Sequence, residues 1–550
     1  MILFISLFYF FPFSEALNNN KQGRPTEVVQ GASENWHQIN VSPSLPRVGD
    51  GWGTNIHWTK ETRPGEAKML SEAFRVVRMD FKWSTVEKIC GKYNFSKYDN
   101  LLTTMQTYNL RPYWILDYGN ECYPPKHKPI IPFVASSCST ETCIIAFARF
   151  AAAAAARYKD NNIIFECLNE PNGMGSDNAT DITKLCLAAS KQIRVQPLTT
   201  FVGPTTSGFP WNYLNTTIHN GILQAFDAVS VHPYRGSSPE TVLSDYKQLR
   251  EMMAAAALSS VIPPIYSGEW GYTTATFPCL YPDRCDETTQ AAYLSRTWLI
   301  NVLANVSVSI DYDWVDGTGS KYQCEARFGS VRTEIGINNQ SFAAKPKYIA
   351  AKRIQNTLGN YQEVRKRIDV IAVRGNRVPK LNDVFVLPFY NDSNTSVGFA
   401  VWSNGTSVGG KCATNSSTVL IKNRVDCGYS GISRELCLSP NNSKREDNYN
   451  CCWEENVKHI GGPECYSVNI RAPANATVSF RVPWEESFLL NRSCWSRVEL
   501  LPSDDDDEEE EEKNTEIICA DSHGILNVSL YPLKTERSSV DAPVYLMPVR

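Results

Sequence analysis

The sequence lacks an excess of charge of either sign. Its 54 Lys and Arg residues against 58 Asp and Glu residues leave a formal net charge of −4 over 550 residues. No cluster of basic residues alternates with aromatic residues, as a groove for single-stranded nucleic acid would require. We therefore expect no nucleic-acid partner.

The sequence also lacks the spacings that are typical of metal sites. None of its 17 cysteines forms a CxxC pair, and none of its 7 histidines forms an HxxxH motif. Zinc sites usually show such ligand clusters. We therefore expect no metal and no other cofactor, and a metal-dependent hydrolase is the least favoured class of enzyme.

Long apolar runs are absent beyond the N-terminus. Residues 1–13 are almost wholly apolar and are followed by small residues, but a membrane span needs about 20 apolar residues. We therefore expect a signal peptide over residues 1–16 rather than an uncleaved anchor, followed by an N-terminal extension over residues 17–46. Such a chain would be secreted, or would stay in the lumen of the secretory pathway, without a stable membrane span.

Glycosylation motifs and cysteines agree with secretion. Asn-x-Ser/Thr sequences recur along the whole chain and include those that begin at Asn40, Asn94, Asn178, Asn215, Asn305, Asn404, Asn475 and Asn527. Glycans on these residues would require exposed positions. In an oxidising compartment most of the 17 cysteines would form disulfides, with one left over. Cys279 with Cys285 and Cys138 with Cys143 could pair locally, although the sequence leaves the connectivity open.

Eight short runs rich in β-branched and aromatic residues alternate with helix-forming segments. The runs occupy residues 47–58, 74–83, 110–120, 161–171, 198–204, 226–234, 263–272 and 306–317, and the strongest helical segments are 140–160, 246–257 and 345–361. Such runs are typical of strands that are buried on both faces. We predict an α/β fold with a (β/α)8 TIM barrel over residues 47–361. An open doubly wound sheet is the alternative. Such a sheet usually shows a glycine-rich phosphate turn after its first strand, and GWGTN at 51–55 is not that fingerprint.

A second, β-rich domain with many cysteines is predicted over residues 362–550. Short strand-like runs, glycosylation motifs and the adjacent Cys451 and Cys452 follow one another there, and a β-sandwich is the favoured form. The acidic run 504–512 cannot pack in a core, so we expect a solvated loop. It lacks the spaced ligands and the glycine turn of a calcium loop.

Two glutamates follow strands on facing parts of the predicted barrel. Glu170 ends the fourth run, and Glu269 lies near the end of the seventh. Active sites of TIM barrels lie at the C-terminal ends of the strands. Hydrolysis of a glycosidic bond requires two carboxyl groups that flank one anomeric carbon. The positions of these two glutamates therefore predict a glycoside hydrolase.

The residues around both glutamates resemble a known group of enzymes. Asn169-Glu170-Pro171 after the fourth strand and Ser-Gly-Glu-Trp-Gly around Glu269 at the seventh resemble clan A glycoside hydrolases. The resemblance is to family 5 (cellulase-like), with similarity to family 39, and covers most of residues 47–355. It implies a retaining mechanism with Glu170 as acid/base and Glu269 as nucleophile.

The resemblance also implies roles for other residues at strand ends. Arg78 would hold the nucleophile ionised, and Asn169 would bind the 2-hydroxyl of the sugar. His232 and Tyr234 would line the site, with a hydrogen bond from the tyrosine to the nucleophile. Trp314 would form a platform on which the sugar stacks.

The same residues make physical sense without the resemblance. Glu170 must hold a proton while Glu269 is charged, so their surroundings must separate two similar pKa values. We expect an apolar strand end to raise the pKa of Glu170 and Arg78 to lower that of Glu269. His57, after the first strand, could contact the sugar in the same mouth.

Each of these residues also has a structural explanation. Asn169 could cap a helix, Arg78 could belong to a buried ion pair, and His232 or Trp314 could be core residues. The hydrolase is favoured because all of them follow strands in the right order. A catalytically inactive carbohydrate-binding or adhesion protein and a transglycosylase with the same glutamates remain as alternatives. The sequence identifies neither the glycan, nor endo or exo action, nor the oligomeric state.

Overall fold

The computed structural model describes residues 47–123, 140–173, 178–196, 199–257, 262–275, 286–318, 323–333, 342–363, 368–377, 379–391, 396–404, 406–409, 424–426, 451–453, 465–472, 475–482, 494–501, 516–521, 525–534 and 539–548. All of them belong to one compact unit, Val41–Arg550. The predicted signal peptide 1–16, the extension 17–46 and the acidic run 504–512 lie outside these ranges. None of the described helices is long and apolar enough to cross a membrane.

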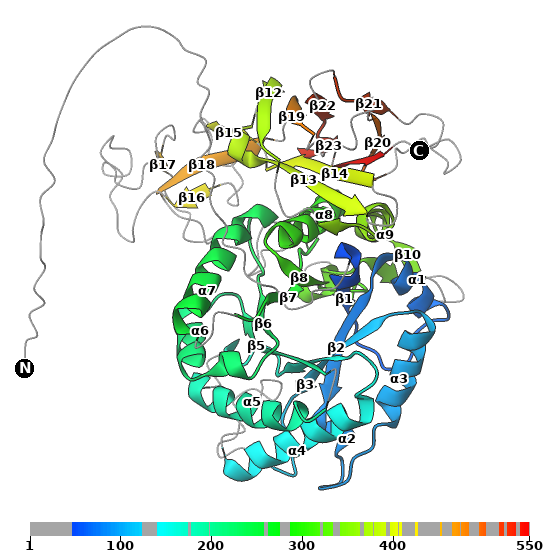
Figure 1. Ribbon diagram of the computed structural model, residues 1–550, viewed down its shortest axis with the longest axis vertical. Helices are drawn as coiled ribbons and strands as arrows, with labels where there is room; N and C mark the ends of the chain where they lie inside the picture. The colour runs from blue at the N-terminus through cyan, green and yellow to red at the C-terminus, as the bar shows by residue number, and fades with distance from the viewer. Residues whose placement is uncertain are drawn as a thin grey trace, which may run out of the picture. The chain divides into compact units, whose positions relative to one another are not determined.

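Eight parallel strands close into a barrel (Figure 1). They are β1 (Trp52–Asn55), β2 (Val76–Lys82), β3 (Arg111–Asp117), β4 (Ile164–Cys167), β5 (Thr200–Ser207), β6 (Ala228–His232), β7 (Ile265–Trp270) and β8 (Val306–Asp311). Each strand pairs with its sequence neighbours, and β8 closes on β1 through Gly53 and Ile310. Apolar side chains that include Val76, Ile164 and Val308 fill the lower interior.

Helices surround the strands as a ring (Figure 1). They are α1 (Glu66–Ala73), α2 (Trp83–Val86), α3 (Ser96–Thr107), α4 (Glu141–Tyr158), α5 (Ala179–Ile193), α6 (Trp211–His219), α7 (Val242–Ala256), α8 (Glu287–Leu303) and α9 (Pro346–Leu358). Side chains cap three N-termini: Thr140 accepts from Cys143 N, Asn178 from Thr180 N and Asp286 from Thr289 N. Such caps satisfy backbone donors that the first helical turn leaves open.

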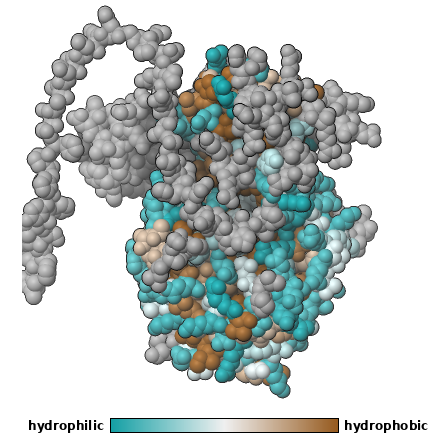
Figure 2. Space-filling model, viewed as in Figure 1, coloured by the Kyte–Doolittle hydropathy of each residue, from teal (hydrophilic) through white to brown (hydrophobic). Residues whose placement is uncertain are grey.

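Short 3-10 helices and a hairpin complete the barrel region. The 3-10 helices are η1 (Val48–Gly51), η3 (Ile222–Gln224), η4 (Pro239–Thr241) and η5 (Cys324–Arg327), and the hairpin pairs β9 (Val331–Thr333) with β10 (Phe342–Ala344). On the face shown in Figure 2, hydrophilic residues cover most of the described barrel surface, and hydrophobic residues form separate groups.

The predicted TIM barrel is confirmed. Seven of the eight predicted runs contain one barrel strand each, and the fifth, 198–204, overlaps β5, which continues to Ser207. The helices α4, α7 and α9 fall on the three segments predicted as strongly helical. The prediction succeeds because strands buried on both faces need nearly continuous apolar runs.

Antiparallel sheets follow the barrel. A six-stranded sheet has the order β11 (Gln362–Glu363), β13 (Val384–Asn391), β14 (Ser396–Ser403), β25 (Val544–Pro548), β20 (Cys494–Val498), β21 (Ile517–Cys519), and a three-stranded sheet has the order β12 (Val370–Arg377), β19 (Asn475–Arg481), β22 (Ile525–Leu530). Phe399 and Val401 of the first sheet share one core with Val478 and Phe480 of the second. Two sheets that share a core form the predicted sandwich-like arrangement.

Smaller strands lie between and after those of the two sheets. They are β15 (Thr406–Gly409), β16 (Arg424–Asp426) and β17 (Cys451–Trp453), which all pair with β18 (Cys465–Ala472), the pair β23 (Leu533–Lys534) and β24 (Ser539–Val540), and the 3-10 helix η6 (Leu381–Asp383). The strands β16 and β17 both pair with the first half of β18, at Tyr466 and Ser467.

Three disulfides are fully described: Cys90–Cys122, Cys167–Cys186 and Cys494–Cys519. Cys143 and Cys324 are also disulfide-bonded. The partner predicted for Cys143, Cys138, lies outside the described residues, as does the predicted pair Cys279–Cys285. Long-range pairing such as Cys90–Cys122 cannot be read from spacing, because it depends on which loops the barrel brings together.

A buried ion pair joins the barrel to the β-rich region. Arg296 of α8 donates two hydrogen bonds to Glu240, at 2.8 and 2.6 Å, and one to Asn404 Oδ1 at 3.1 Å. Trp402 Nε1 also donates to Glu240, at 3.0 Å. Asn404 is only 8% exposed, so this asparagine does not have the exposed position expected of a glycosylated residue.

We expect Glu240→Gln to lower the free energy of unfolding by about 3–5 kcal/mol, because it leaves the buried Arg296 guanidinium without its counter-charge. Thermal or urea unfolding measures this. The control is Glu287→Gln in the exposed pair with Arg332, whose side chains are 29% and 47% exposed; it should cost about 0–1 kcal/mol. Equal effects of the two variants would contradict the importance of the buried pair.

Candidate active site

Polar side chains replace the apolar ones toward the C-terminal ends of the barrel strands. Side chains two residues apart on a strand face the same side. The side chains of Val76, Ile164 and Ala228 belong to the apolar core inside the barrel. Two residues further along the same strands, Arg78, Glu166 and Ser230 therefore also point into the barrel. On β6, His232 is the next residue that does so.

Arg78 is the centre of this polar layer and is only 1% exposed. Its guanidinium binds Glu166 at 2.5 Å and Glu269 at 2.6 Å, and it donates to Asn169 Oδ1 at 2.8 Å. Burial alone would lower the pKa of Arg78, but the charges of Glu166 and Glu269 raise it well above its ordinary value. One permanent cation thus holds two carboxylates and an amide in place.

Glu269 near the end of β7 is held by two donors. Arg78 Nη1 binds Oε2 at 2.6 Å, and the Tyr234 hydroxyl donates to Oε1 at 2.8 Å. Burial and then the charge of Glu269 raise the pKa of Tyr234 well above its ordinary value, so this hydroxyl keeps its proton. Both contacts stabilise the charged form of Glu269.

Glu170 lies after β4 with a φ of +45°. Left-handed backbone is unfavourable for a residue with a side chain and is concentrated at functional sites. The Glu170 side chain is directed toward His232, with Oε1 2.7 Å from Nδ1. The left-handed backbone of Glu170 is therefore found at a residue whose side chain is turned toward the barrel mouth.

His232 is completely buried between Arg78 and Glu170. Its Nε2 lies 3.3 Å from Arg78 Nη2. Because a guanidinium only donates, Nε2 must accept, and the proton of the neutral ring is then on Nδ1, facing Glu170. Burial raises the pKa of Glu170, but the hydrogen bond from His232 and the charge of Arg78 outweigh it and lower the pKa. The expectation that a strand end would raise this pKa is wrong, because the strand end is polar.

The two glutamates approach each other closely. Ligand atoms of Glu170, His232 and Glu269 all lie within 4.8 Å of one another. These three residues could share a cation in principle, but the Arg78 guanidinium already lies against Glu269 and His232. A metal ion there would face a buried positive charge, so this group does not suit a resident metal.

A cavity of about 260 Å³ opens above the two glutamates. His57 and Asn169 line it together with Glu170, Glu269 and Tyr234. The His57 ring binds Asp313 at 3.2 Å, and this hydrogen bond raises the pKa of His57 to about 9. His57 is therefore a cationic donor at the cavity in neutral solution.

Trp314 does not lie in the cavity, which corrects the prediction of a stacking platform. Its side chain is completely buried, and its Nε1 donates to Glu66 of α1 at 2.9 Å. It follows β8 and packs outward against Phe74 and Tyr348. The aromatic residue of this segment that lines the cavity is Tyr312, two positions earlier.

Glu166 was missed by sequence reasoning although it binds Arg78. It is completely buried, and the Tyr113 hydroxyl also donates to it at 2.5 Å. The available signal was an acidic residue within the apolar run of β4. The sequence analysis also missed the role of Gly268. A Cβ at this position would lie 2.3 Å from Ser230 Oγ, so the close approach of β6 and β7 requires a glycine there.

A closed parallel barrel with facing carboxyl groups after β4 and on β7 defines a clan A glycoside hydrolase. The chain belongs to glycosyl hydrolase family 5, because the model of Cellulase (glycosyl hydrolase family 5) matches residues 26–308. The predicted class of enzyme and the predicted family are thereby confirmed. Residues 416–468 match the model of the Trefoil (P-type) domain, which the sequence analysis did not foresee.

Solved structures of glycoside hydrolases share the fold. A family 39 glycoside hydrolase from the gut symbiont Bacteroides cellulosilyticus WH2 is 17% identical, with a TM-score of 0.57 over 92% of this chain and 83% of that chain. A GH30 endoxylanase from Clostridium papyrosolvens C71 is 11% identical, with a TM-score of 0.50 over 92% of this chain and 98% of that chain. No curated protein matches the chain by sequence.

We expect nuclear magnetic resonance titration of His57 to give a pKa of about 9. Asp313→Asn removes the charge but keeps an accepting oxygen, and should lower this pKa toward the ordinary value of about 6.5. Asp99→Asn, in a surface ion pair with Arg157, is the control and should leave the pKa of His57 unchanged. An unchanged pKa of His57 in the variant would contradict the role of Asp313.

Trp314→Phe tests the corrected role of this residue. We expect it to lower stability by about 1–3 kcal/mol, because the buried Glu66 loses a donor, and to leave KM unchanged. Tyr312→Leu, which removes the aromatic face in the cavity, should instead raise KM. A raised KM for Trp314→Phe with unchanged stability would restore the stacking platform.

Proposed function

We propose that the protein is a secreted, retaining β-glycosidase that uses Glu269 as nucleophile and Glu170 as acid/base. The main support for this proposal is that a carboxylate oxygen of Glu170 lies within 4.8 Å of one of Glu269. Retaining enzymes hold their carboxyl groups about 5–5.5 Å apart, whereas inverting enzymes need about 6.5–9.5 Å to admit a water molecule. The short separation supports a double displacement.

Glu269 attacks the anomeric carbon in the first step. Arg78 and Tyr234 each bind one of its oxygens, so the attacking carboxylate is held in one orientation. Glu170 protonates the leaving oxygen, and the glycosyl–Glu269 ester forms as the glycosidic bond breaks. Glu170 then takes a proton from water, which attacks the ester and releases the sugar and free Glu269.

Glu170 must be protonated before it can act as an acid. Burial is the largest influence on it and raises its pKa, although His232 and Arg78 outweigh burial in the free protein. A sugar that displaces water from the cavity increases the contribution of burial. Binding of substrate therefore favours the protonated form of Glu170 at the step that needs it.

Asn169 is placed to hold the sugar. Its Oδ1 accepts from Arg78 at 2.8 Å, which fixes the orientation of the amide and leaves Nδ2 as the donating end. A donor beside the nucleophile suits the sugar 2-hydroxyl, whose hydrogen bonds strengthen in the oxocarbenium-like transition state.

Secretion is supported by disulfides and exposed glycosylation motifs. The chain forms Cys90–Cys122, Cys167–Cys186 and Cys494–Cys519, and disulfides persist in oxidising compartments. Asn94 and Asn215 are exposed. Together with the apolar N-terminus, they favour passage through the secretory pathway.

Kinetics on a panel of aryl β-glycosides test the roles of both glutamates. Glu269→Gln should lower kcat/KM by at least about 10⁴-fold, because no nucleophile remains. Glu170→Gln should cost about 10²–10⁴-fold on poor leaving groups and much less on activated ones, which need little protonation. The matched control is Glu325→Gln, which removes a third carboxyl group from the cavity. Because Glu325 has no role in the proposed chemistry, this variant should lose less than about 10-fold in kcat/KM on either kind of leaving group.

The stereochemistry of the first product tests the mechanism independently. A retaining enzyme releases the β-anomer from a β-glycoside before mutarotation, as proton spectra of the reaction would show. Early release of the α-anomer would exclude the double displacement.

Two other outcomes concern the site and the reaction. Activity that survives Glu269→Gln and Glu170→Gln would show that the chemistry lies elsewhere. Product analysis with an added acceptor sugar separates hydrolysis from transglycosylation.

A further inference from the structure

A second pair of carboxyl groups lies at the ends of β2 and β3, on the side of the barrel that carries Arg78. Asp80 follows Arg78 at the next inward position of β2 and lines the cavity, with its side chain 26% exposed. Asp117 ends β3 and is completely buried. The mechanism proposed above uses neither residue.

Asp117 has no ordinary compensation for a buried charge. Among the described residues, no donor reaches either of its carboxyl oxygens, and the side chain within hydrogen-bonding reach is Asp80. Burial raises the pKa of Asp117 well above its ordinary value, and the charge of Asp80 raises it further. A buried carboxyl group that no donor reaches favours its neutral form, and in that form its O–H can donate a hydrogen bond to Asp80.

Asp80 differs from Asp117 in having a cationic partner. The Lys82 ammonium lies 3.2 Å from Asp80 Oδ2 and stabilises the carboxylate. With a proton from Asp117 on one side and Lys82 on the other, Asp80 can only accept further hydrogen bonds. It presents this accepting group to the same cavity as Glu170 and Glu269.

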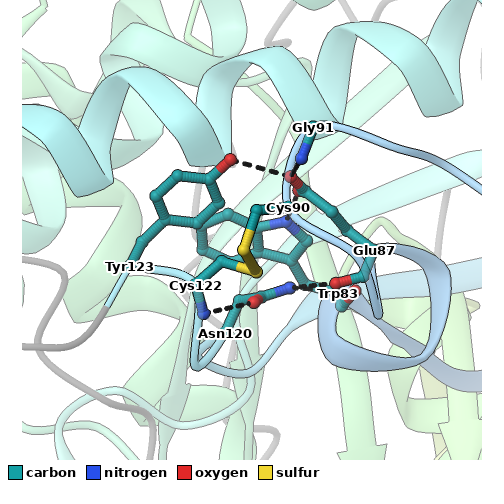
Figure 3. Close-up of a disulfide and its surroundings, with 7 residues drawn as sticks. All are labelled: Trp83, Glu87, Cys90, Gly91, Asn120, Cys122 and Tyr123. Atoms are coloured by element: carbon teal, nitrogen blue, oxygen red, sulfur yellow. Dashed lines mark hydrogen bonds between the residues drawn. A yellow bond between two sulfur atoms is a disulfide. The ribbon is translucent and has the colours of Figure 1, made fainter.

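The loops beyond both aspartates are joined covalently. Cys90, which follows β2 and α2, is bonded to Cys122, which follows β3 (Figure 3). Glu87 beside the disulfide accepts from Trp83 Nε1 and Gly91 N at 2.6 Å and from the Tyr123 hydroxyl at 2.8 Å. These contacts restrain the two strand ends, and a recognition group gains precision when its support is rigid.

The charge around the cavity restricts what Asp80 can bind. Glu170, Glu269 and Glu325 line the same space, and burial together with Glu269 raises the pKa of Glu325. The carboxylate of an anionic sugar such as a uronide would be repelled by Asp80 wherever it took the place of a hydroxyl group bound to Asp80. Neighbouring hydroxyl groups of a neutral sugar offer two donors to the two oxygens of one carboxylate.

We propose that Asp80 determines specificity by accepting hydrogen bonds from neighbouring hydroxyl groups of a neutral sugar bound beside the two glutamates, and that Asp117 positions it. This inference rests on the proposed glycosidase function and names the substrate class of the same site. It assigns a substrate contact to β2 and a supporting role to the buried end of β3.

The test combines variants with substrate analogues. The parent is the best neutral aryl β-glycoside of the wild-type protein, and its analogues each lack one ring hydroxyl. Asp80→Asn should lower kcat/KM for the parent by about 10- to 100-fold, as expected for hydrogen bonds to a charged group. At least one deoxy analogue should lose a similar factor in the wild type and lose almost nothing further in Asp80→Asn. The matching uronide should be the poorest substrate of the wild type.

Two variants of Asp117 separate positioning from a structural role. Asp117→Asn keeps an N–H that can donate to Asp80, so it should retain most of the activity on the parent. Asp117→Leu removes the donor and should reproduce the substrate pattern of Asp80→Asn, with a loss on the parent and little on the sensitive deoxy analogue. Asp99→Asn, in a surface ion pair with Arg157, is the control and should change nothing.

Several results would overturn the inference. The first is an equal loss of kcat/KM in Asp80→Asn on the parent and on every deoxy analogue. The second is no loss of kcat/KM in Asp80→Asn on the parent. The third is a preference of the wild type for the uronide. If Asp117→Leu does not fold, Asp80→Asn with the deoxy series still decides. Failure of the proposed function is distinguishable, because the wild type would then hydrolyse no glycoside or Glu269→Gln would remain active.

Discussion

The buried guanidinium of Arg78 is the interaction on which the rest of the site depends. A cation that is only 1% exposed needs negative counter-charges, and Glu166 on β4 and Glu269 on β7 supply them. Breaking a buried ion pair by removing one partner is strongly destabilising, because the other charge is left uncompensated. The contacts that keep this cation stable therefore also fix the nucleophile and, through Asn169 and His232, the surroundings of Glu170.

The same principle recurs at the junction with the β-rich region. Arg296 on α8 is paired with Glu240, and Trp402 of β14 and Asn404, which follows β14, complete the hydrogen bonds. Polar groups that are buried between two layers need partners from both. The junction is therefore specific, because Arg296 of α8 needs partners from both regions.

The accuracy of the sequence analysis varied with how local each signal is. The period of apolar residues along a strand is local, and all eight barrel strands were predicted. The role of Trp314 was wrong because its direction depends on the path of the chain after β8, which turns the ring onto Glu66 of α1. Glu166 was missed because an acidic residue inside a strand has meaning only when a cation from another strand faces it.

The sequence by itself determined the class of fold, the family and the order in which polar residues follow the strands. These follow from hydrophobic periodicity and from short motifs such as Asn-Glu-Pro, which are properties of neighbouring residues. The tertiary structure decided the Cys90–Cys122 disulfide, the polarity around Glu170, the burial of Trp314 and the pairing of Asp80 with Asp117. Each of these depends on which atoms of distant segments come within a few ångströms, and barrel closure sets those distances.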